Sequence, residues 1–173
     1  MKSTLLHTSD GPTVTGVVTV IGTDANTGQE LSRIVSKNMV MDGSFTGLDL
    51  IIQWIIGQMA SGQGAETYRN GVNYGEIGTG NTAPALSDTA LTAGVARTIP
   101  TLQQDFGLTQ AVLQFFFSDA SLANGTYKEF GTFVNGTASL GSGKIFNRVL
   151  FSGDYVKVSG QDTTVQVTFT MGQ

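Results

Sequence analysis

The order of hydrophobic and polar residues along the chain predicts a mainly β protein. Residues 13–21 are rich in valine and threonine, which suit a pleated, half-buried strand. A polar turn at 24–28 leads to a second strand at 31–41, and the two are expected to form a hairpin. Residues 163–171 alternate between apolar and polar side chains, so one face of that strand should be buried. Further strands are predicted at 72–77, 93–99, 111–117, 127–134, 145–151 and 155–158.

One amphipathic helix is predicted after the second strand. Its apolar residues recur at helical spacing from Leu48 to Met59, and two glycines within 61–64 end it, so the helix is expected over about 45–60. Trp54 lies beside the apolar stripe, where the edge of the core is favoured and a subunit contact is the alternative.

These elements favour an antiparallel β-sandwich, jelly-roll-like, with one amphipathic helix. Residues 1–13 show no periodic pattern and are interpreted as an N-terminal arm, which leaves 14–173 as a single domain. Alternation within the triplet at 115–117 sends Phe115 and Phe117 to one face and Phe116 to the other. Core packing is favoured for this strand, and cover by a neighbouring subunit is the alternative.

Composition and charge narrow the function. Only 13% of the residues are charged, the net charge is -4, and there is no cysteine, which excludes thiolate catalysis and disulfides. The chain lacks the basic surface that binds phosphates, so nucleic acid is not an expected partner. No apolar run approaches the roughly 20 residues that cross a bilayer, and the first residues lack a signal-peptide pattern, so neither membrane insertion nor export is expected.

The candidate chemical motifs are weak. Residues 78–83 match the GxGxxA dinucleotide fingerprint, but Pro84 and a strand follow where the fingerprint needs a helix. We interpret the motif as a loop whose glycines adopt φ values closed to other residues. The single histidine, His7, lies in the arm, and the carboxylates lack calcium-loop spacing. No catalytic residue, cofactor or metal ligand is therefore predicted, although a cation shared between loops and a pair of glycosidase carboxylates stay open.

Three stretches resemble a known group of proteins. They are IGTGNTAPALSDTAL at 77–91, followed by Arg97, then ANGTYKEFGTF at 123–133 and IFNRVLFS at 145–152. Together they resemble a widespread group of tailed-bacteriophage virion proteins described as tail-fibre, tail or minor structural proteins. The group often has an acidic residue shortly before the arginine. Residues 92–96 have none, so any carboxylate paired with Arg97 must come from elsewhere.

The physical chemistry of the motif predicts a shaped loop. The glycines allow tight turning, Pro84 fixes φ, and Asp88 with Thr89 can accept hydrogen bonds from nearby backbone amides. Arg97 is expected to donate to a carboxylate or to loop carbonyls. The candidate motif residues are Gly78, Thr79, Gly80, Pro84, Asp88, Thr89, Leu91 and Arg97.

The resemblance implies a non-enzymatic virion component made in the bacterial cytoplasm. We expect a symmetric homo-oligomer that also contacts other virion proteins, with a tail-associated position (fibre attachment, baseplate or neck) ahead of capsid decoration. A module that binds a host receptor or glycan is the alternative from another class, and a glycan-degrading enzyme is the weakest interpretation.

Overall fold

The computed structural model describes residues 13–40, 72–106 and 110–172, which form nine strands and, within those ranges, no helix. The predicted helix at about 45–60, Trp54, His7 and the arm up to residue 12 lie outside the described residues. The strands are β1 (Thr13–Asp24), β2 (Glu30–Val40), β3 (Val72–Gly78), β4 (Gly94–Thr98), β5 (Pro100–Phe106), β6 (Gln110–Phe117), β7 (Gly125–Val134), β8 (Lys144–Lys157) and β9 (Gln161–Gly172).

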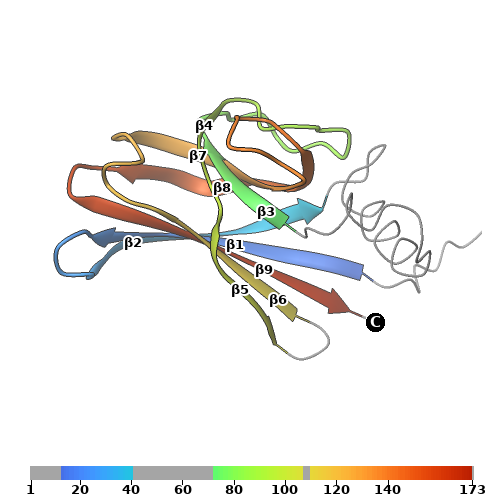
Figure 1. Ribbon diagram of the computed structural model, residues 1–173, viewed down its shortest axis with the longest axis horizontal. Helices are drawn as coiled ribbons and strands as arrows, with labels where there is room; N and C mark the ends of the chain where they lie inside the picture. Colours follow the sequence, from blue (N-terminus) through green and yellow to red (C-terminus); the bar gives the residue numbers. More distant parts are fainter. Residues whose placement is uncertain (1–12, 41–71, 107–109, 173) are drawn as a thin grey trace, which may run out of the picture.

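The strands form two antiparallel sheets, which confirms a mainly β fold. Neighbours follow the order β4-β3-β7-β8-β2-β1-β9-β6-β5 (Figure 1). We call β2-β1-β9-β6-β5 the five-stranded sheet and β8-β7-β3-β4 the four-stranded sheet. The end of β2 pairs with β8, where Met39 lies opposite Arg148, and this pairing joins the sheets on one side. On the other side the chain passes from β4 to β5 through the single residue Ile99.

The alternating pattern of β9 has the predicted outcome. Val165, Val167 and Phe169 are buried, while the threonines and the glutamine between them are partly exposed. In β6, Phe115 and Phe117 are buried and Phe116 is 41% exposed, so the phenylalanine triplet also alternates as expected.

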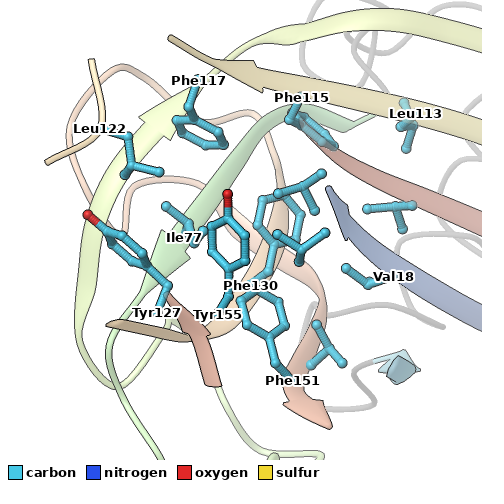
Figure 2. Packing of buried hydrophobic residues seen from close by; sticks show 14 of the residues in the cluster. Val18, Ile77, Leu113, Phe115, Phe117, Leu122, Tyr127, Phe130, Phe151 and Tyr155 are labelled. Atoms are coloured by element: carbon cyan, nitrogen blue, oxygen red, sulfur yellow. The ribbon is translucent and has the colours of Figure 1, made fainter. Parts of the chain in front are cut away.

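The main hydrophobic core takes residues from both sheets. Figure 2 shows Phe115 and Phe117 of β6 near Ile77 of β3 and Phe130 of β7. The rings of Phe115 and Phe130 pack with their centroids 5.4 Å apart, a tilted arrangement that aromatic pairs prefer. Tyr155 belongs to this core, and its buried hydroxyl is hydrogen-bonded to Thr163.

Two strand predictions were wrong. β5 was missed because Pro100 begins it and its residues 101–104 are exposed, which fits the edge position where proline is tolerated. The predicted strands at 145–151 and 155–158 are one strand, β8. Its residues between Leu150 and Tyr155 leave the ladder with β7, and the Ser152 amide donates to Ser36 Oγ of β2 instead.

Candidate functional site

The glycine-rich motif belongs to a loop, residues 79–93, that covers the face of the four-stranded sheet pointing away from the core (Figure 1). Ile77 and Phe130 point into the core, so Glu76 and Glu129, which precede them, lie on the opposite face. Both glutamates are almost completely buried. Charged groups therefore fill the space between the sheet and its covering loops.

Strand register brings the charged residues together. Arg97 of β4 lies opposite Glu76 of β3, Glu76 lies opposite Gly131 of β7, and Gly131 lies opposite Arg148 of β8. Glycine at 131 leaves room for the loop, because a Cβ there would lie 2.9 Å from the Leu91 side chain. The four residues form one row across the sheet. Arg97 and Glu76 form a salt bridge within the row, and Arg148 forms one with Glu129, two residues before the glycine on β7.

Glu129 fixes the two ends of the motif loop. Its Oε1 accepts hydrogen bonds from the backbone amides of Gly80 (3.1 Å) and Ala93 (2.7 Å), and its Oε2 accepts one from Thr92 N (3.2 Å). The Nε and Nη2 atoms of Arg148 donate to the same Oε2 at 3.0 and 2.8 Å. Five donors converge on one buried carboxylate, which compensates its removal from water.

Arg148 fixes the middle of the loop. Its Nη1 lies 2.5 Å from Asp88 Oδ2, and its Nη2 donates to the Thr82 carbonyl (2.8 Å) and to Thr92 Oγ1 (2.7 Å). Asp88 also accepts a hydrogen bond from the Ala85 amide, three residues earlier, so it binds a nearby backbone donor as expected, although not in an Asx turn. One guanidinium therefore holds the loop at three positions and pairs with two carboxylates.

The motif glycines serve a different purpose from the one predicted. Neither Gly78 nor Gly80 has a positive φ, so the expectation of backbone angles closed to other residues was wrong. Glycine is required by close approach: a Cβ at either position would overlap with the Glu129 carboxylate or with the Ala93 carbonyl. The two glycines therefore leave the space that the buried Glu129 carboxylate needs beside Arg148.

Arg97 holds the second covering loop, residues 135–143. Its Nη1 donates to Glu76 Oε2 (3.3 Å) and to the Ser139 carbonyl (2.7 Å), and its Nη2 donates to the Ser142 carbonyl (2.6 Å). The prediction that Arg97 binds a carboxylate or loop carbonyls is confirmed, and Glu76 is the partner from elsewhere in the chain.

Burial shifts the pKa values of both members of the Glu76–Arg97 pair. Burial raises the pKa of the Glu76 carboxyl, while the Gly141 amide and the charge of Arg97 oppose the rise. Burial also lowers the pKa of the Arg97 guanidinium. The guanidinium lies over two rings, 4.8 Å from the Tyr74 centroid and 4.3 Å from that of Phe133. Cation–π attraction thus adds to the salt bridge.

The remaining motif residues have smaller parts. Leu91 packs against Phe133 and Ile145 in a second apolar cluster beneath the loop. The Thr79 amide donates to the Ala93 carbonyl at 2.9 Å, which extends the pairing of β3 with β4. Pro84 is partly buried and Thr89 is exposed.

Sequence reasoning missed Glu129 and Arg148 as site residues, although both lie in the stretches that carry the resemblance. The available signal was a charged side chain in the middle of an otherwise apolar strand, as in FNRVLF and YKEFG. Such a residue is expected to have a buried partner.

Within the described residues, no three His, Cys, Asp or Glu side chains gather as a metal would require. The GxGxxA match ends β3 and leads into loop, with no helix in residues 79–93. The described part of the chain has no helix long and apolar enough to cross a membrane.

No protein-family model, no curated protein and no solved structure matches this chain.

Proposed function

We propose that this chain is a non-enzymatic structural protein of a tailed-bacteriophage virion. In this proposal it is a β-sandwich that assembles as a symmetric homo-oligomer together with other virion proteins. A tail-associated position, at the fibre attachment, baseplate or neck, stands ahead of capsid decoration because the proteins that the sequence resembles are described as tail components.

One observation carries the proposal: the three resembling stretches meet in a single buried cluster. Gly80 and Asp88 come from the first stretch, Glu129 from the second and Arg148 from the third, and all four are joined by hydrogen bonds or salt bridges. Gly80 and Glu129 are 49 positions apart in the chain. A resemblance whose separate parts meet in one contact cluster is expected of a shared structural unit, which supports relating the chain to that group.

The chemistry of the cluster favours architecture over catalysis. A general acid or base must reach a substrate within hydrogen-bonding distance. The carboxylate of Glu129 is fully buried, and its donors are loop amides and Arg148. The guanidinium of Arg97 is likewise occupied by a carboxylate and two loop carbonyls. These groups hold two loops on a sheet, which is what an assembly module requires.

Imaging of intact particles tests the proposal. Particles purified from a phage that encodes the chain with a small epitope tag would be labelled with gold-bound antibody, and particles of the untagged phage serve as the control. We expect label at the tail. Label on the icosahedral shell would favour capsid decoration, and particles without the chain would refute a virion role.

A binding and turnover experiment separates the remaining classes. The recombinant chain would be applied to a glycan array and to polysaccharide substrates. We expect neither saturable binding nor cleavage. Saturable glycan binding would favour the receptor-binding alternative, and cleavage that is abolished by a single Asp or Glu substitution would favour an enzyme.

A further inference from the structure

The outward face of the five-stranded sheet carries one charge along the described parts of its three central strands. That charge is Asp162 at the start of β9, beyond the last pair with β6, where its carboxylate accepts a hydrogen bond from the Asp119 amide. Twelve uncharged side chains that point away from the core on β1, β9 and β6 form what we call the open face. The chain as a whole has 13% charged residues, so about one or two charges would be expected among twelve positions. The open face consists of Thr15, Val17, Thr19, Ile21, Thr164, Gln166, Thr168, Thr170, Gln110, Val112, Gln114 and Phe116.

Apolar side chains on and beside the open face are exposed. Val17 and Phe116 belong to it, and Leu31 and Val35 of β2 and Leu102 of β5 flank it. These five are among eleven large hydrophobic residues of the described chain that are exposed. Figure 1 shows the strands that carry them side by side. Their concentration on one sheet marks an interaction surface.

Register aligns these residues in a row across the sheet. Val35 lies opposite Thr19, Thr19 opposite Gln166, Gln166 opposite Gln114, and Gln114 opposite Leu102. The two glutamines are hydrogen-bonded to each other at 3.1 Å. The centre of the row is therefore a polar but uncharged pair, and its two ends are apolar.

Charge indicates what can cover this surface. The chain has a net charge of -4, so two copies repel each other wherever their acidic surfaces meet. The open face is a surface on which two copies can approach without opposing like charges. A strongly charged partner would find no counter-charge on it, whereas a second copy offers an equally uncharged and partly apolar surface.

The open face together with its flanking strands β2 and β5 offers an area near that of a stable pair. Five strands spaced about 4.8 Å apart, over the length of the eight-residue β6 at about 3.4 Å per residue, cover about 650 Å². Specific interfaces bury about 800 Å² on each partner, and accessible area exceeds the flat area of a sheet.

We propose that the open face binds the open face of a second copy of this chain, so that the two five-stranded sheets pack face to face. The proposal rests on the homo-oligomeric assembly in the proposed function and specifies its surface. Aligned sheets pack about 10 Å apart, with strands within about 30° of each other. The interface is isologous, which means that both copies use the same surface. If one residue contacts a second residue of the partner, that second residue also contacts the first residue of the partner.

The flanking charges select the orientation. Two cations, Arg33 and Lys37, lie on the outward face of β2, where Arg33 pairs with Glu30, whereas β5 has no cation. A two-fold axis parallel to the strands places β2 of one copy over β5 of the other. An axis across the strands would place β2 over β2 and oppose the cations. The first arrangement is the one we infer, and it brings Val35 near the partner's Leu102.

Solution mass of the full chain tests the surface. We expect the unmodified chain to form a pair or an even multiple at micromolar concentration by light scattering. F116K and V17K should each be monomeric with an unchanged melting temperature, because both side chains are already exposed. V156K and L140K, which are exposed but lie outside the five-stranded sheet, are the matched controls and should associate normally. A monomeric unmodified chain, or association that survives in both face variants, would overturn the proposal.

Cross-linking tests the orientation. The chain has no cysteine, so single Val35→Cys and Leu102→Cys variants each introduce one unique thiol. A mixture of the two treated with a bismaleimide should give the mixed product in excess over either self-product. Excess of the Val35 self-product would overturn the parallel axis. Neither result depends on where the chain lies in a particle, so failure here is distinct from failure of the virion role, which particle labelling tests.

Discussion

Replacing Glu129 with glutamine removes the charge at the centre of the loop contacts while it keeps the volume of the side chain. Glutamine can retain Oε1 as the acceptor for the Gly80 and Ala93 amides. Its amide nitrogen then faces three donors that now bind Oε2: the Thr92 amide and two nitrogens of Arg148. The substitution therefore breaks the salt bridge and places donors against a donor.

The expected loss follows from the burial of both partners. The Arg148 side chain is 1% exposed and that of Glu129 is 0% exposed. Removal of one partner from a buried ion pair costs about 3–5 kcal/mol because the other charge is left in a poorly solvating environment. Asp88 still pairs with Arg148 from the partly exposed side, which places the expected loss at the lower end, about 3 kcal/mol. For a chain of this size that corresponds to a melting temperature lower by roughly 6–12 °C.

Chemical denaturation of the full chain measures this loss. K128A is the matched control, because Lys128 is the neighbouring residue and its bridge to Asp154 is exposed, so about 0–1 kcal/mol is expected. The double variant E129Q/R148M should be more stable than the sum of its single variants predicts, because it leaves no fully buried charge unpaired, and Asp88, which also loses its partner, is partly exposed. A loss below about 1 kcal/mol for E129Q would refute the view that the buried pair holds the loop.

Three further substitutions test neighbouring features. G80A should destabilise the fold by about 1–3 kcal/mol through overlap with a carboxylate, whereas G125A, where a Cβ meets nothing within 4 Å, should not; equal melting temperatures would contradict the need for space. R97K keeps the charge but loses the fork that donates to two loop carbonyls, and should cost about 2 kcal/mol in denaturant titration, so an unchanged midpoint would show that charge alone suffices. A hydrogen bond from a buried lysine lowers the pKa of Asp119, so its contribution to stability is present above its usual pKa and is lost as pH falls through the lowered value. D119N should accordingly lose less stability than the unmodified chain in acid, D154N is the control, and identical acid profiles for D119N and the unmodified chain would contradict the assignment.

The strands with a clear period were predictable from sequence. The alternation of β9 and the phenylalanine triplet of β6 each reflect a sheet with one face on the core, and side-chain period alone carries that information. The hairpin of β1 and β2 was predictable because Asp24 and Gly28 mark its turn, and Gly28 has the positive φ that glycine adopts readily.

The partners in the buried cluster were not predictable, because strand register creates them. Glu76 meets Arg97 only because β3 and β4 pair in one register, and a shift by one residue would send either side chain to the other face. The role of Gly80 depends on Glu129, which lies on a strand 49 positions away. From the local sequence, the glycines could therefore be predicted to form a tight turn. Their role of leaving space for the Glu129 carboxylate could not be predicted.

β5 shows a third kind of limit. Proline and four polar residues gave it a weak local signal, and its pairing with β6 decides that it is a strand. Edge strands depend least on their own burial pattern, so sequence predicts them least well.

The pairing of β1 with β9 has a consequence for the order of events during synthesis. The two strands are in register from Thr13 opposite Gly172 to Asp24 opposite Gln161, and every other strand lies between them in the chain. A ribosome that adds about 5–20 residues per second needs roughly ten seconds to make the intervening chain. During that time the edge of β1 that later pairs with β9 has no partner strand. β1 is rich in valine and threonine. We expect the yield of folded protein to depend on temperature and on chaperones acting during translation, since unpaired edges of this kind aggregate.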